Sequence, residues 1–172
     1  MLQIALPNKG ALSQDAVRLV GEAGYHCRRH GRELAVRDAE HEVDFLFLRP
    51  RDIAVYVAHG VLDLGITGRD LALDCDVPTV ELLSLGFGRS SFCYAVPKGR
   101  SLSPDDFVHL RIATSYPKLV EDDMARRDVP VSIVRLHGAV EISIELGVAD
   151  VVADVVQSGR TLEQAGLKTV GD

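Results

Sequence analysis

The chain has 172 residues, of which 47% are hydrophobic and 26% are charged. This length fits one domain or two small ones, and the composition is that of a globular protein with a real core. Lys and Arg total 19 against 25 for Asp and Glu, which gives a formal net charge of −6. Because nucleic-acid binding depends on clustered positive charge, we exclude a nucleic-acid module and expect no nucleic-acid partner.

The cysteines and the N-terminus indicate a compartment. Cys27, Cys75 and Cys93 are odd in number, widely spaced and without a Cys-x-x-Cys pair, which is unlike a disulfide framework or a zinc ribbon. The first nine residues lack the basic and long apolar regions of a signal peptide. No apolar run approaches the ~20 residues of a membrane span. We therefore expect a cytoplasmic protein with no membrane partner.

The first elements form the start of an α/β unit. The pattern predicts a strand over Leu2–Leu6, a turn over Pro7–Gly10 and a helix over Ala11–Ala23. Lys9 lies in this turn, at the carboxyl end of the strand, where ligands bind in open α/β sheets. The alternative is a solvated loop lysine.

The next segment, Tyr25–Glu42, is polar, with a short strand expected at Leu34–Val36. His26 and His30 are four residues apart around Cys27, a spacing that could suit a metal ion. Because the surrounding Cys-Arg-Arg-His-Gly-Arg run is strongly cationic, we interpret this segment as solvated surface. We assign no metal-ligating residue in the chain.

A clear apolar strand follows at Val43–Leu48, and Pro50 is well placed in the first turn of the next helix. Arg49 is thus a second cation at the carboxyl end of a strand, and its guanidinium suits phosphate through paired, charge-assisted hydrogen bonds. The alternative for Arg49 and Arg51 is an ion pair with Asp52 or another acid. At least one of the two arginines is expected to be engaged in this way.

A third strand is predicted at Leu62–Thr67, followed by a turn that opens another helix. The glycines Gly65 and Gly68 would let a ligand approach the backbone closely. Asp70 is a candidate ligand contact, or alternatively the N-cap of the helix.

The domain boundary is predicted at a glycine pair. Strands are expected at Thr79–Leu85 and Ser91–Val96, on either side of the hinge-like Gly86–Gly88. We therefore divide the chain into a first lobe, residues 1–88, and a second lobe, residues 89–172.

The second lobe repeats the α/β rhythm. A short helix is expected from Ser103, and the later elements are predicted in this order: strand Leu110–Ala113, polar turn Thr114–Pro117, a helix that follows this turn to about Arg127, strand Val131–Leu136, helix Val140–Leu146 and strand Ala149–Val156. Tyr116 lies at a carboxyl end, where it could stack on a base or pack on its own helix. Glu141 lies in the first turn of its helix, where an acid is favoured electrostatically in any case.

The stretch Ala149–Leu162 indicates a phosphosugar site. Its valines favour a strand covered on both faces, and Asp154 interrupts them with a carboxylate that requires a polar partner. Small residues, Ser158, Gly159 and Thr161, then begin a helix whose free N–H groups suit a phosphate. The alternative is that Ser158 or Thr161 merely caps the helix.

Seven motifs, in order, give the chain a family resemblance. They are Ala5–Gly10, Phe47–Asp52, Asp63–Asp70, Leu85–Gly88, Arg111–Pro117, Gly138–Glu141 and Asp154–Leu162. The chain resembles ATP phosphoribosyltransferase of histidine biosynthesis, and most of all the actinobacterial long-form enzymes. The resemblance implies a two-lobed α/β fold like that of the type II periplasmic solute-binding proteins, with the active site in the interlobe cleft. It also implies magnesium and a glycosyl transfer in which N1 of the ATP adenine displaces pyrophosphate from phosphoribosyl pyrophosphate.

The resemblance assigns roles residue by residue. The loop of Ser158, Gly159, Arg160, Thr161 and Leu162 would bind the 5-phosphate. Asp154 and Glu141 would be catalytic, engaging the ribose hydroxyls and favouring positive charge on the sugar. Lys9 and Arg49 would face the pyrophosphate, which would carry the magnesium, and Asp70, Leu71 and Tyr116 would lie nearer the ATP. The family also implies a homo-oligomer, a dimer or higher.

Long-form family members continue past Asp172 with strands that return to the first lobe and with a regulatory domain that binds histidine. We therefore expect the regulatory domain, and inhibition by histidine, to be absent here. Two rival interpretations stay open: a two-lobed protein that closes on an anionic ligand without chemistry, and an inactive catalytic fragment that depends on a partner.

Overall fold

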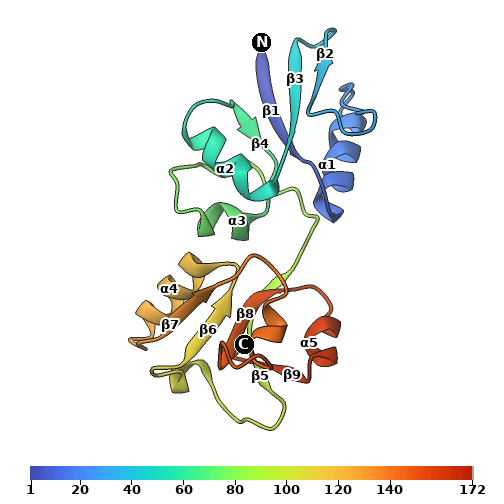
Figure 1. Ribbon diagram of the computed structural model, residues 1–172. Helices are drawn as coiled ribbons and strands as arrows, with labels where there is room; N and C mark the ends of the chain where they lie inside the picture. Colours follow the sequence, from blue (N-terminus) through green and yellow to red (C-terminus); the bar gives the residue numbers. More distant parts are fainter. Residues whose placement is uncertain (172) are drawn as a thin grey trace. The chain divides into compact units, whose positions relative to one another are not determined.

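The computed structural model describes residues 1–171, which form two compact units (Figure 1). The first unit runs from Met1 to Gly88, and the second begins at Arg89. No helix in the described part of the chain is long and apolar enough to cross a membrane.

The first unit is built on a four-stranded sheet in the order β2-β3-β1-β4. Its strands are β1 (Leu2–Pro7), β2 (Ala35–Asp38), β3 (Val43–Leu48) and the very short β4 (Leu64–Gly65). Strands β3 and β4 run parallel to β1, whereas β2 runs antiparallel to β3. The carboxyl ends of β1, β3 and β4 therefore lie at one edge of the sheet.

Helices cover both faces of this sheet (Figure 1). They are α1 (Ala11–Glu22), α2 (Pro50–Ala58) and α3 (Arg69–Asp74). Phe45 and Phe47 of β3 pack with Ala16 and Val20 of α1, whereas the alternate residues Leu46 and Leu48 pack toward Ile53 of α2. This alternation is what a strand buried on both faces requires.

The second unit holds a five-stranded sheet in the order β7-β6-β8-β5-β9, counted over the described residues. The strands are β5 (Ser91–Pro97), β6 (Arg111–Thr114), β7 (Ser132–Arg135), β8 (Val151–Val156) and β9 (Leu167–Val170). Strands β6, β7 and β8 are parallel, and β5 runs antiparallel to β8 and β9.

Two layers cover the faces of this second sheet. Val151 and Ala153 of β8 belong to a core that includes Val120 and Met124 of helix α4 (Pro117–Arg126). The opposite face of β8 is covered by two short elements, the 3₁₀ turn η2 (Val140–Ser143) and helix α5 (Arg160–Gln164). A further 3₁₀ turn, η1 (Pro104–Asp106), lies where a short helix was predicted.

The predicted strand Thr79–Leu85 is wrong, because this segment has no regular secondary structure. A strand is stabilised by hydrogen bonds to a neighbour, and no described strand pairs with this segment. Its apolar side chains consequently stay exposed: Val80 is 82% exposed, Leu82 is 74% exposed and Leu83 is 73% exposed.

Two other predictions need correction, and one strand was missed. The strand expected over Leu62–Thr67 shrinks to β4, because the chain turns away where the Thr67 hydroxyl donates to the Pro50 carbonyl at 2.6 Å. The helix expected over Val140–Leu146 is only η2, where the Ser143 hydroxyl donates to the Val140 carbonyl at 2.6 Å and so competes with a regular helix. Strand β9 was not predicted at all.

Candidate functional site

Lys9 and Arg49 leave the ends of adjacent parallel strands. Pro7 of β1 pairs with Leu48 of β3, and the Asn8 N–H donates to the Leu48 carbonyl at 2.8 Å. Because such strands lie about 4.8 Å apart, the backbones of Lys9 and Arg49 leave the sheet close together at one edge. Both residues are exposed, and neither side chain has a hydrogen-bond or ion-pair partner among residues 1–171. This pair can therefore receive an anion.

The neighbouring arginines are engaged elsewhere. Arg51 forms an ion pair with the buried Asp74, which confirms that one of the two arginines flanking Pro50 binds an acid. Arg69 donates two hydrogen bonds to Glu81, one of them from Nε at 2.8 Å. These bonds hold the pKa of the Glu81 carboxyl below its ordinary value. Arg51 and Arg69 thus have carboxylate partners, whereas Arg49 has none among residues 1–171.

Asp70 and Leu71 lie in the first turn of α3, at the same edge of the sheet. The N-cap of α3 is Gly68, so the interpretation of Asp70 as the N-cap is wrong. A Cβ on Gly68 would lie 2.3 Å from Asp70 Oδ1, so the glycine makes room for this carboxylate. Gly65, by contrast, makes room for α2 and not for a ligand.

Asn8 is a residue that the sequence analysis missed. Its Oδ1 is buried and accepts no hydrogen bond from the described residues. A buried polar atom without a partner is costly, and such atoms concentrate where a ligand completes the network. The signal available in the sequence was its position, directly before Lys9 in the turn after β1.

The second unit brings three loops to one edge. Tyr116, Glu141 and Ser158 follow β6, β7 and β8 respectively, and these three strands are parallel. The loops that carry the predicted phosphosugar residues therefore begin at the same edge of this sheet.

Asp154 faces the layer that also contains Glu141. Alternate residues of a strand share a face, so Asp154 lies on the side of Val152 and Val156. Those valines pack with Val140 of η2 and Leu162 of α5. The fold therefore brings the turn of Glu141, the start of α5 and the carboxylate of Asp154 to one face of β8. Asp154 also accepts a hydrogen bond from the Val155 N–H at 2.8 Å.

The loop Ser158–Leu162 presents backbone amides. Gly159 is the N-cap of α5, with a positive φ of 70° that favours glycine, and no side chain of the described residues caps this helix. The alternative in which Ser158 or Thr161 caps α5 is therefore wrong. The bond from the Glu163 N–H to the Gly159 carbonyl is 3.0 Å, so the N–H groups of the three preceding residues lack an intrahelical acceptor. Ser158, Arg160 and Thr161 are exposed, whereas Leu162 is 7% exposed and can offer only its backbone.

Tyr116 is more enclosed than a base-stacking residue is expected to be. Its exposed fraction is 8%, and its ring meets Phe92 of β5 edge-on with centroids 5.8 Å apart. The ring of Tyr116 therefore packs on β5, a contact that neither of the two alternatives from the sequence predicted. Its contact with a substrate stays a prediction.

The chain is similar to known proteins over its whole length. A family model described as ATP phosphoribosyltransferase matches residues 49–172. ATP phosphoribosyltransferases of Salinibacter ruber and Rhodococcus jostii are 60% and 58% identical over 172 residues, which cover 99% and 100% of this chain. The chain spans 61% of the length of each of these relatives.

Solved structures agree with this match. The ATP phosphoribosyl transferase (HisG:HisZ) complex from Thermotoga maritima has a chain that matches 99% of this one, with a TM-score of 0.86 and 26% identity; 82% of that chain is covered. An ancestral arginine-binding protein matches 99% of the chain, with 78% of its own length covered, at a TM-score of 0.56 and 14% identity. The second match confirms the predicted fold class, that of periplasmic-binding-protein-like α/β proteins. The chain belongs to the ATP phosphoribosyltransferase family.

Proposed function

We propose that this chain transfers the phosphoribosyl group of phosphoribosyl pyrophosphate to N1 of the ATP adenine, with release of pyrophosphate, as the first step of histidine biosynthesis. The proposal depends on one observation, the grouping of predicted site residues on one face of β8. There Asp154, the turn of Glu141 and the amide-rich start of α5 lie together. A phosphorylated sugar needs this combination of carboxylates for its hydroxyls and amides for its phosphate.

Asp154 and Glu141 are the proposed catalytic residues. Displacement at the anomeric carbon passes through a sugar with oxocarbenium character, and carboxylates held near the ring favour that positive charge. Ser158, Gly159, Arg160, Thr161 and Leu162 would bind the 5-phosphate, largely through backbone N–H groups, since Leu162 is buried. Fixing the sugar at both ends orients its anomeric carbon for attack.

Lys9 and Arg49 are proposed to receive the pyrophosphate. Their exposed cations, which have no partner among residues 1–171, lie at adjacent strand ends and support this role. Mg²⁺ prefers oxygen ligands, and phosphate oxygens serve it well, so cations at this edge fit a metal held by the pyrophosphate and not by the protein. Magnesium would supply charge neutralisation on the leaving group, and the two side chains would orient it.

The nucleophile requires little from the protein. N1 of adenine already carries a lone pair, so the reaction needs alignment and no general base. Asp70, Leu71 and Tyr116 are the residues proposed to lie nearer the ATP. Asp70 and Leu71 start α3 at the edge of the first sheet that also carries Lys9 and Arg49.

We also propose that the protein is cytoplasmic and self-associates as a dimer or higher oligomer. A reducing compartment agrees with Cys27, Cys75 and Cys93, none of which forms a disulfide in the described part of the chain. Light scattering after size-exclusion chromatography gives the mass in solution, and a monomer at assay concentrations would contradict the proposed self-association.

The activity is tested by mixing the protein with ATP, phosphoribosyl pyrophosphate and Mg²⁺ and measuring phosphoribosyl-ATP and pyrophosphate. We expect both products in equal amounts and neither when one component is omitted. A protein that binds phosphoribosyl pyrophosphate by calorimetry but yields no product would instead be a ligand-binding protein or an inactive fragment.

A further inference from the structure

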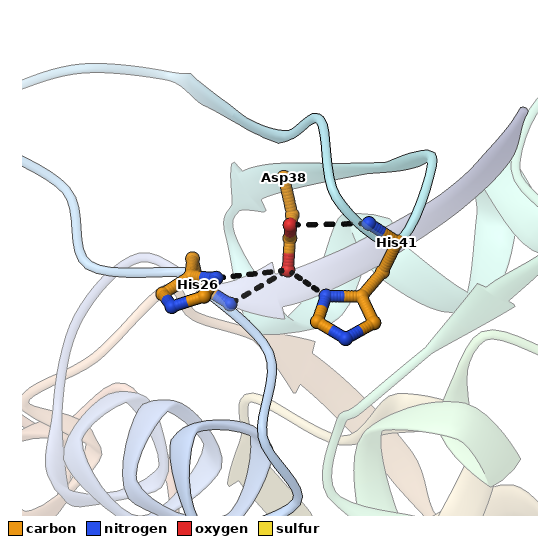
Figure 2. Close-up of side chains that lie close together, drawn as sticks. All are labelled: His26, Asp38 and His41. Carbon is orange, nitrogen blue, oxygen red and sulfur yellow. Dashed lines mark hydrogen bonds and ion pairs between the residues drawn. The ribbon is translucent and has the colours of Figure 1, made fainter.

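A buried carboxylate between two histidines lies apart from the predicted site. The Asp38 side chain is 1% exposed, and its Oδ2 accepts the His26 N–H at 2.7 Å and lies 2.8 Å from His41 Nδ1 (Figure 2). The hydrogen bond from the His26 N–H, together with that from His41, lowers the pKa of Asp38 to about 2.

The second imidazole points to the same oxygen without bonding to it. His26 Nδ1 lies 3.6 Å from Asp38 Oδ2, which is beyond hydrogen-bond distance. A ligand atom from each of the three residues lies within 4.8 Å of the others. Ligands about 2.05 Å from a tetrahedral zinc ion are about 3.3 Å from each other, and the two measured separations from Oδ2 fall on either side of this value.

We propose that His26, Asp38 and His41 bind a divalent transition-metal ion, for which Zn²⁺ is the best fit. Two imidazoles and one carboxylate are ligands that zinc prefers, whereas magnesium seeks an all-oxygen shell. The His26 side chain is 72% exposed and the His41 side chain 37%, so the outer side of the cluster is open to water as a fourth ligand.

Two arginines near the cluster are engaged by other groups. Arg37 forms an ion pair with Asp44, with Nε and Oδ1 2.8 Å apart. Arg29 turns away to the Asn8 carbonyl, at 2.7 Å, and lies over the Phe47 ring. Glu40 adds negative charge instead, with its Oε2 3.9 Å from His26 Nδ1.

The spacing of His26 and His30 in the sequence does not describe this cluster, whose second histidine is His41. Residues 25–30 are not helical, so a spacing of four does not bring His26 and His30 onto one face. The His30 N–H is instead bonded to Glu33 at 2.8 Å. The antiparallel pairing of β2 with β3 brings Asp38 and His41 to His26.

The cluster is separate from the proposed transferase site. Asp38 pairs with Val43, the first residue of β3, whereas Arg49 follows the last residue of that strand. The length of β3, about 17 Å at 3.3 Å per residue, separates the two ends. A metal ion here would tie the segment after α1 to the turn between β2 and β3, and this role does not depend on the proposed activity.

The test titrates metal-free protein with Zn²⁺ by calorimetry in the presence of excess Mg²⁺, and with Co²⁺ by visible absorption. We expect one Zn²⁺ per cluster, a rise in the thermal unfolding midpoint that saturates at that ratio, and a Co²⁺ spectrum of nitrogen and oxygen ligation. His26→Ala and His41→Ala should each lower the affinity at least about tenfold. His30→Ala, a histidine of the same segment outside the cluster, should bind zinc as the unmodified protein does.

His26→Ala is the decisive variant, because an exposed side chain can be removed without unfolding the unit. Asp38→Asn tests the third ligand but also disturbs three hydrogen bonds, so its thermal midpoint without metal must be measured beside its affinity. If no saturable binding occurs, or if His26→Ala binds zinc as tightly as the unmodified protein, the proposal is overturned and the cluster is a structural hydrogen-bond network only.

Discussion

Ile53 of α2 occupies the space in which a side chain at Gly65 of β4 would lie. A Cβ added to Gly65 would be 2.3 Å from Ile53 Cγ2 and 3.8 Å from Ala5 Cβ. Gly65 thus permits close packing of α2 on the sheet, and this packing fixes the end of β3 from which Arg49 emerges. The glycine serves the scaffold of the site and not direct contact with a ligand.

Gly65→Ala should therefore destabilise the first unit by about 1–3 kcal/mol, the usual effect of overpacking a core. Urea unfolding measures this change. Because the collision is with one methyl group, the double variant Gly65→Ala with Ile53→Ala should lose less stability than the two single losses added together. Strict additivity would show that Ile53 does not cause the effect.

The apolar residues differ sharply in what they contribute to stability. Phe45 of β3 is fully buried against α1, so Phe45→Ala should lower the unfolding free energy by about 3–5 kcal/mol. Leu82 is 74% exposed, and Leu82→Ala should stay within about 0.5 kcal/mol of the unmodified protein. Chemical denaturation of both variants checks the pair, and an equal loss would contradict the described burial.

Asp150 should contribute stability that depends on pH. Arg111 donates to its two carboxylate oxygens at 3.0 Å each, which holds the pKa of Asp150 below its ordinary value. A lowered pKa stabilises the folded state above the unfolded pKa of about 3.9, and this contribution is lost as the pH falls through the folded value.

The unmodified protein should accordingly exceed Asp150→Asn in unfolding midpoint at pH 6, and the difference should shrink as the pH falls below about 4. Thermal unfolding across this range tests the sign. A difference that grows on acidification would contradict the ion pair as its cause.

The local pattern predicted the elements whose signals lie within the element itself. Strand β3 falls on the predicted residues Val43–Leu48, and α2 begins at the predicted Pro50. These signals, an apolar run and a proline at the first helical position, need no distant partner. Lys9 and Arg49 directly follow these predicted strands, so the sequence also predicted that both lie at carboxyl ends of strands.

Features that depend on distant partners were beyond the sequence. Strand β9 exists because Leu167–Val170 pairs with β5, and the segment Thr79–Leu85 fails to be a strand because no described strand pairs with it. Asp154 was predicted as a candidate, but its shared face with η2 and α5 depends on how those short elements cover β8. The contact between His26 and His41 likewise depends on the β2–β3 pairing.

The rate of phosphoribosyl-ATP formation by the unmodified protein, Asp154→Asn and Asp150→Asn tests the central claim most directly. Both changes remove one carboxylate from the same stretch of chain, but Asp150 is paired with Arg111 and precedes β8, whereas the predicted phosphate loop follows the other end of that strand. We expect Asp154→Asn to lower kcat/KM about 100-fold or more, an effect far larger than its effect on stability, and Asp150→Asn to keep the rate. Product formation that is absent in the unmodified protein, or undiminished in Asp154→Asn, would contradict the account.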